Sequence, residues 1–295
     1  MSDIPPDEAE IEASRAPLLD HLIELRKRLI VCVLSIVVGF GVCFFFSTPI
    51  YEFLTHPFGL AGEIFAAQQK GEAKGPFDLL YVLVGLKTIT GVTGSTQGFI
   101  YTAPLEFFFT KLKLAGFGAV ALTFPILAWQ VYAFVAPGLY KRERRAFLPF
   151  LLAAPVLFLM GAALVYYLIL PFVLWFSLSQ QIVGNVGVQV QMLPKVSDYL
   201  TLVTTLLLAF GLCFQLPVVL TLLGIAGIVN SAMLWKGWRY AVLAVVVVAA
   251  IVTPPDPISQ LLLAGPIIAL YFLSILCVKL IERRRDKDDA DAAAA

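Results

Sequence analysis

Six long apolar segments run through this chain of 295 residues, and they restrict its fold more than any other feature. A helix needs about 20 apolar residues to cross the hydrocarbon core of a bilayer. Only 14% of the residues are charged and 60% are hydrophobic, more apolar surface than a soluble fold could bury. We therefore predict an all-α integral membrane protein with six transmembrane helices, at about residues 29–47, 112–135, 148–172, 200–228, 240–252 and 258–280.

The fifth segment is the shortest, because its purely apolar part covers only residues 240–252. At 1.5 Å per residue this part is about 20 Å long, whereas the hydrocarbon core is about 30 Å thick. Either Trp235, Trp238 and the corner at 253–255 complete the span, or the bilayer is thinner there. The sequence leaves both alternatives open.

The basic residues indicate the orientation of the chain. Six spans place both termini on one side of the membrane, and most of the 21 Lys and Arg fall in the segments on that side. Because cytoplasmic loops carry an excess of Lys and Arg, we expect both termini to be cytoplasmic. Residues 1–17 are predicted to be a disordered acidic tail and residues 282–295 a second cytoplasmic tail, on either side of a membrane domain at 18–281.

The first external segment, at about residues 48–111, is rich in Gly, Thr and aromatic residues. Its prolines, which remove backbone donors, are expected to divide it into short helices over the outer membrane surface. These prolines are Pro49, Pro57, Pro76 and Pro104.

Within the predicted spans, prolines and glutamines are the notable residues. Each proline removes a helical N–H and favours a kink. Gln130 and Gln215 carry amides that, within a membrane, most often hydrogen-bond to a neighbouring helix. The span prolines are Pro125, Pro155, Pro217 and Pro266.

Few residues are of the kinds that catalysis or metal binding requires. His21 and His56 are the only histidines, and there is no His-Glu-x-x-His or Gly-rich phosphate-binding motif. No predicted span has an acidic residue at mid-depth, which argues against an ion-coupled carrier or an intramembrane protease. We therefore expect no enzyme activity, metal, cofactor or nucleic-acid partner.

Two carboxylates on the cytoplasmic side are the most informative residues. Residues 18–29 carry leucines at helical spacing on one face, which predicts a helix at the interface before the first span. On that helix Glu24 can pair with Arg28 at i,i+4, an ordinary helix contact. Glu143 is the one acid among the basic residues of 141–145, and a local ion pair is an open alternative for its role.

Four motifs occur in a fixed order along the chain. They are His-Leu-Ile-Glu-Leu-Arg-Lys-Arg-Leu at 21–29, Gln-Val-Tyr-Ala-Phe-Val-Ala-Pro-Gly-Leu-Tyr-Lys-Arg-Glu-Arg-Arg at 130–145, Ala-Phe-Gly-Leu-Cys-Phe-Gln-Leu-Pro at 209–217 and Val-Thr-Pro-Pro-Asp at 252–256. The first two are the more specific. Together the four resemble the TatC family, the core subunits of the twin-arginine protein translocase, over most of residues 18–285.

The resemblance implies a function and a location. TatC proteins bind the signal peptides of folded export substrates, which carry two consecutive arginines. They assemble with TatA, TatB and other TatC copies in the bacterial cytoplasmic (inner) membrane, among its lipids, and the proton-motive force drives transport. The implied signal-peptide-binding residues are Glu24, Glu143, Phe134, Arg26 and Pro137, and the implied partner-docking or transport residues are Gln215, Pro217, Pro57 and Asp256.

The chemistry of arginine fits this role. Successive side chains of an extended peptide point to opposite faces, so two adjacent arginines need acceptors on two walls. A carboxylate binds the planar guanidinium at two points, which it cannot do with lysine. Many family members carry Glu where this chain has Gln215, which cannot ionise but can still contact a TatA or TatB helix. The alternative function is a small-molecule permease, for which charged ligands at mid-membrane would be expected.

Overall fold

The computed structural model describes residues 6–69, 98–135, 141–181, 193–252 and 257–294, and those residues are almost entirely helical. Among them, six helical stretches are long and apolar enough to cross a membrane. The predicted fold class is therefore confirmed. The helices are α1 (Pro6–Phe45), α2 (Ser47–Gln69), α4 (Glu106–Val135), α5 (Lys141–Leu164), the π-helix η2 (Val165–Ile169), α6 (Leu170–Ser179), α7 (Val196–Cys213), α8 (Leu216–Ile225), α9 (Ser231–Val252) and α10 (Pro257–Ala294).

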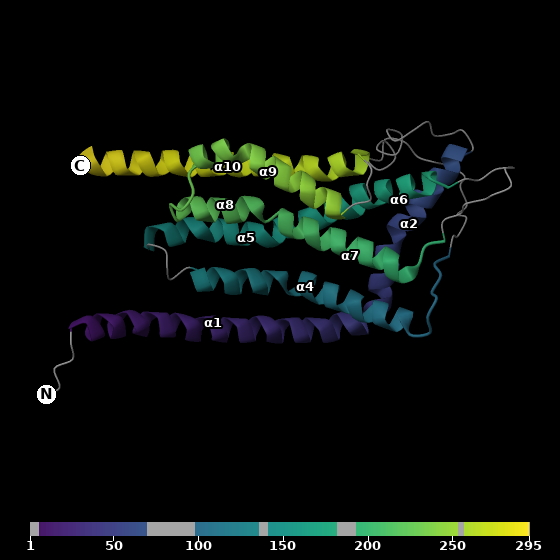
Figure 1. Ribbon diagram of the computed structural model, residues 1–295, viewed down its shortest axis with the longest axis horizontal. Coiled ribbons are helices and arrows are strands. Elements are labelled where there is room, and N and C mark those ends of the chain that lie inside the picture. Colours follow the sequence, from purple (N-terminus) through teal and green to yellow (C-terminus); the bar gives the residue numbers. More distant parts are fainter. Residues whose placement is uncertain (1–5, 70–97, 136–140, 182–192, 253–256, 295) are drawn as a thin grey trace.

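The long helices run side by side along one axis (Figure 1). α1 packs mainly against α4, α5 packs against α7, and α10 packs against α8 and α9. The beginning of α1, the beginning of α5 and the end of α10 lie together at one end of the molecule, which we call the inner end. α2, α6 and the beginnings of α4 and α7 lie at the opposite, outer end.

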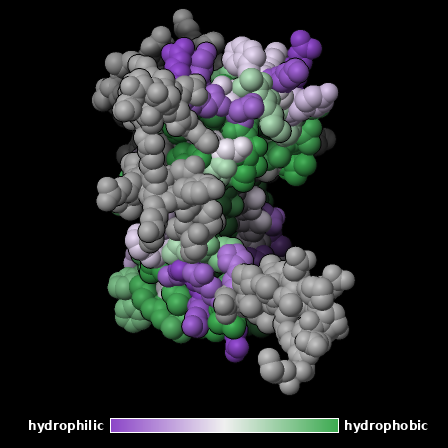
Figure 2. Space-filling view, turned by 90° about the vertical axis from the view of Figure 1, so that its left-hand side faces the viewer, coloured by the Kyte–Doolittle hydropathy of each residue, from purple (hydrophilic) through white to green (hydrophobic). Residues whose placement is uncertain are grey.

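Polar residues gather at the inner end. Figure 2 looks onto this end and shows hydrophilic side chains in two groups, one at the height of α9 and α10 and the other at the height of α1, with hydrophobic residues between them. The hydrophilic groups at this end therefore border hydrophobic side chains. The sequence analysis predicts that this end faces the cytoplasm.

The tightest packing lies toward the outer end. The central cluster of buried residues draws on α2, η2, α6 and α7, including Ile169, Val173 and Leu206, which are fully buried. Most large side chains along α1 are exposed, as lipid-facing residues would be, and α1 is held mainly along its α4 side. Among the described residues, the outer half is thus more densely packed than the inner half.

Pro57 does not divide the first external segment, and this is a correction to the sequence analysis. α2 continues for 23 residues through Pro57. Proline lacks the N–H that would reach the carbonyl four residues earlier, that of Phe53. The Tyr166 hydroxyl of η2 donates to that carbonyl at 2.7 Å, and the Tyr199 hydroxyl of α7 donates to the carbonyl of Leu54 at 2.7 Å. Two tertiary hydrogen bonds therefore stabilise the helix at its proline.

The fifth span is longer than its apolar core. α9 has 22 residues, from Ser231 to Val252, which at 1.5 Å per residue corresponds to about 33 Å. Trp235 and Trp238 lie inside this helix and pack near Phe272 of α10. The flanking residues thus complete the span, and no thinning of the bilayer is needed to accommodate it.

Other boundaries differ from the sequence expectations. α1 begins at Pro6 and α10 continues to Ala294, so residues 6–17 and 282–294 are helical where the sequence suggests tails. Alanine and glutamate in these segments have high helix propensity, which favours this extension. The fourth span is divided at Phe214 and Gln215, directly before the helix that contains Pro217.

Glycines allow α5 and α7 to approach closely. A Cβ added at Gly161 would lie 2.8 Å from the backbone carbonyl oxygen of Phe210, and one at Gly211 would lie 2.4 Å from the ring of Phe158. Small residues at such crossings let membrane helices pack by direct contact.

We predict that Gly161→Ala lowers the melting temperature of the purified protein, because the new methyl group meets a backbone oxygen that cannot move aside. Overpacking of this kind costs about 1–3 kcal/mol. Gly116→Ala in α4 is the matched control, since nothing lies within 4 Å of its added Cβ, and it should be neutral or stabilising. Equal melting temperatures for the two variants would contradict the close packing of α5 and α7.

Candidate functional site

Three side chains from two helices form a polar cluster at the inner end, which we call the inner site: Glu24, Arg28 and Gln130. Arg28 donates from Nε and Nη2 to one carboxylate oxygen of Glu24, at 3.1 Å and 2.5 Å. Its remaining terminal nitrogen, Nη1, donates to Oε1 of Gln130 on α4 at 3.4 Å. The guanidinium therefore links α1 to α4.

The inner site is open to solvent. The side chains of Arg28 and Glu24 are 26% and 33% exposed. They line a hollow of about 580 Å³ together with Ile23, Lys27, Val31 and Gln130. Its lining combines a carboxylate, two cations and apolar side chains, a combination suited to a peptide with charged and apolar residues.

Phe134 lies at the end of α4 and stacks on His21 of α1, with ring centroids 4.3 Å apart and planes inclined by 22°. The two rings form a second contact between α1 and α4, beside the inner site. Phe134 and Glu24, which the sequence analysis assigns to one binding site, are thus on packed helices at the same end.

The remaining residues of the predicted signal-peptide site are placed less fully. Arg26 is exposed on α1. Glu143 belongs to the first turn of α5 at the inner end, and its side chain lies outside the described part of the structure. Pro137 lies outside the described residues. The backbone nevertheless brings the helices that carry the two carboxylates to the same end (Figure 1).

Gln215 and Pro217 occupy the junction of α7 and α8. The Gln215 amide donates from Nε2 to the backbone carbonyl of Ala154 in α5 at 2.9 Å. Pro217 is buried within the first turn of α8. The interhelical hydrogen bond agrees with the structural role that the sequence favours for a glutamine in a span.

Pro57 and Asp256 are distant from the inner site in the chain. Pro57 is buried in α2 at the outer end, and Asp256 lies outside the described residues. Among the described residues, no group of three or more His, Cys, Asp and Glu could hold a metal ion.

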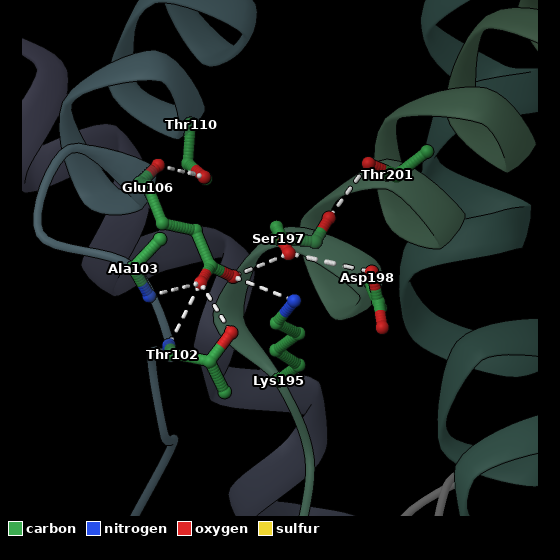
Figure 3. Close-up of polar contacts among 8 residues, drawn as sticks. All are labelled: Thr102, Ala103, Glu106, Thr110, Lys195, Ser197, Asp198 and Thr201. Atoms are coloured by element: carbon green, nitrogen blue, oxygen red, sulfur yellow. Dashed lines mark hydrogen bonds and ion pairs between the residues drawn. The ribbon is translucent and has the colours of Figure 1, made fainter.

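Glu106 forms a second polar cluster, at the outer end, that the sequence analysis missed (Figure 3). One carboxylate oxygen accepts the backbone N–H groups of Thr102 and Ala103 at 2.8 and 3.2 Å. The other accepts the Ser197 hydroxyl at 2.6 Å and lies 3.7 Å from Nζ of Lys195. A single carboxylate thus joins the beginning of α4 to the beginning of α7.

A helix-start signal could have revealed Glu106. Pro104 precedes it by two residues, and proline at the first helical position followed by an acid at the third is typical of a helix N-terminus. The sequence analysis treated Pro104 only as a breaker. The contact with Ser197, 91 residues away, has no signal in the local sequence.

We predict that Glu106→Ala lowers the melting temperature by a few degrees, because donors of two helices lose a shared acceptor. Glu106→Gln should fall between Glu106→Ala and the original protein, since an amide oxygen can replace one carboxylate oxygen. Glu52→Ala is the control, because Glu52 is exposed on α2 and, within the described residues, its side chain has no hydrogen bond or ion pair. No difference between Glu106→Ala and Glu52→Ala would show that the cluster is not stabilising.

Comparison with known proteins places the chain in one family. The family model described as "Sec-independent protein translocase protein (TatC)" matches residues 20–266. A protein of that name from Magnetococcus marinus is 41% identical over 94% of this chain and 89% of its own length. Another from Synechocystis is 34% identical, over 94% of this chain and 91% of its own length.

The fold is similar to solved structures of the same family. A crystal structure described as the twin arginine translocase receptor TatC in DDM aligns with a TM-score of 0.67 and 29% identity. The alignment covers 87% of this chain and 98% of that one. With six helices able to cross a membrane, the chain is a multi-pass membrane protein that belongs to the TatC family of Sec-independent protein translocase proteins.

Proposed function

We propose that this protein is the signal-peptide receptor and scaffold of a twin-arginine translocase in the bacterial inner membrane. It would bind Arg-Arg signal peptides of folded proteins at the inner end, which faces the cytoplasm together with both termini. It would then recruit TatA and TatB, with transport driven by the proton-motive force. The observation that carries this proposal is the inner site, where a solvent-accessible carboxylate already holds a guanidinium.

The helices that carry Glu24 and Glu143 support a site for a pair of arginines. Glu24 is on α1, and Glu143 is on the first turn of α5, which follows α4 along the chain. α1 packs against α4, so the two acids lie on different helices around one end. Because adjacent arginines of an extended peptide point in opposite directions, one arginine would pair with each acid. Phe134, Arg26 and Pro137 would border the bound peptide.

The apolar part of the signal peptide and the partner helices would bind along the spans. Gln215 would offer a polar contact to a TatA or TatB helix beside its bond to Ala154. Pro217 would shape that surface, and Pro57 and Asp256 would act at the outer end. Other TatC copies and membrane lipids would cover further exposed apolar faces.

A polar-solute permease is less well supported than this receptor role. A hollow of about 600 Å³ opens between α1, α2, α4 and α5, lined by residues such as Phe117, Pro125, Phe158 and Tyr166. None of its described lining residues is charged. A polar solute would need charged or strongly polar ligands within the membrane.

We predict that Glu24→Lys and, separately, Glu143→Lys abolish export of a folded reporter that carries an Arg-Arg signal. A lysine at either position would repel the arginine that the acid binds. Export is measured as reporter appearing outside the cytoplasm, with immunoblots of membranes confirming that each variant is inserted.

Asp286→Lys is the matched control, since it reverses an acid near the C-terminus, outside the proposed site. It should leave export unchanged. Normal export by Glu24→Lys or Glu143→Lys would remove that residue from the site.

A further inference from the structure

Arg28 has the same chemical group as the substrate residue that Glu24 is proposed to bind. Its guanidinium contacts Glu24 through two nitrogens, Nε and Nη2, and both reach the same carboxylate oxygen, Oε1. A second arginine cannot use Oε1 in the same way while Arg28 remains there. The protein thus presents its proposed receptor carboxylate with one oxygen, Oε1, already bonded and its charge already paired by one of its own side chains.

Gln130 provides a second acceptor for Arg28. Its Oε1 lies 3.4 Å from Nη1 of Arg28, on a helix other than that of Glu24. Arg28 therefore touches two acceptors at once, with short contacts to Glu24 and a longer one to Gln130. The hollow beside them also gives the guanidinium space to move.

We propose that Arg28 is an internal competitor that lowers the affinity of the inner site for signal peptides. In the free protein it occupies Glu24, and a signal-peptide arginine displaces it toward Gln130, leaving the α1–α4 link in place. The inference rests on the proposed function, because it assumes that Glu24 binds a substrate arginine.

The geometry of the contact with Glu24, and not the competition, favours arginine over lysine. A displacing arginine restores the forked contact that Glu24 loses, with two N–H groups directed at the carboxylate. A lysine ammonium is a single, strongly hydrated charge and cannot restore that geometry. The free energy needed to displace Arg28 is the same for either peptide, so the competition lowers both affinities by the same factor and leaves the preference for arginine unchanged.

The expected change in peptide affinity follows from the solvent exposure of the Arg28–Glu24 pair. The side chains of Arg28 and Glu24 are about one quarter to one third exposed. Ion pairs with this much exposure contribute little free energy to stability. Removing the competitor should tighten Arg-Arg peptide binding by up to about fivefold. A stronger internal pair would block the site, and without the pair Glu24 would bind any cationic peptide more tightly.

The test is a binding titration of the full-length protein in detergent with fluorescent signal peptides that carry Arg-Arg or Lys-Lys. Arg28→Gln removes the competing charge and keeps an amide that can still donate to Glu24. Lys27→Gln is the matched control, because Lys27 is the neighbouring cation and, among the described residues, makes no ion pair or side-chain hydrogen bond. This control measures how the loss of one positive charge at the rim of the hollow changes peptide affinity.

We expect Arg28→Gln to bind both the Arg-Arg and the Lys-Lys peptide up to about fivefold more tightly than Lys27→Gln does, with the preference for Arg-Arg over Lys-Lys unchanged. Arg28→Lys, which keeps the charge without the fork, should show a smaller change in the same direction. Equal or weaker binding by Arg28→Gln relative to Lys27→Gln would overturn the competitor role, and so would tighter binding of only one of the two peptides.

Glu24→Gln separates this inference from the proposed function. If Glu24→Gln weakens peptide binding while Arg28→Gln does not tighten it, the receptor role stands and the competitor role is wrong. If Glu24→Gln leaves binding unchanged, Glu24 is not the receptor group, and both proposals are wrong. Melting temperatures of all four variants show whether each one is folded.

Discussion

The need to satisfy buried backbone carbonyls determines how this helical protein holds its shape. Buried N–H and C=O groups are costly without partners, and each proline removes a donor from its helix. At Pro57 the missing donor is replaced by the hydroxyl of Tyr166, which donates to the carbonyl of Phe53. Tyr166 lies 113 residues after Phe53 in the chain. The same contact fixes α2 against the central helices, so a local defect becomes a tertiary link.

The resulting asymmetry between the two ends suits a receptor. At the outer end, buried aromatic residues, the tyrosine hydroxyls and the carboxylate of Glu106 join α2, α4, η2 and α7. At the inner end, α1 and α4 are joined by the exposed contacts of Arg28 and by the stacking of His21 on Phe134. In the proposed receptor, the densely packed outer half would position the inner helices, and the fewer contacts between those helices would allow them to adjust to a peptide.

The sequence was sufficient to predict the fold class, because long apolar segments have few alternatives to transmembrane helices. It was also sufficient to bring attention to Glu24 and Phe134, since each lies in a motif. It could not show that α2 continues through Pro57, or that Glu106 meets Ser197. Those features depend on donors and acceptors from distant parts of the chain, for which spacing along the sequence carries no signal. The length of α9 was ambiguous because hydropathy alone excludes the tryptophans that extend it.

The central claim is that Glu24 and Glu143 each bind one arginine of the same signal peptide. A double-mutant cycle tests it most directly: binding is measured for Glu24→Gln and Glu143→Gln against peptides in which the first or the second arginine is replaced by lysine. We expect each acid to couple strongly to a different arginine, by about 0.5–3 kcal/mol, and weakly to the other. Additive effects for every acid–arginine combination, or coupling of both acids to the same arginine, would contradict the claim.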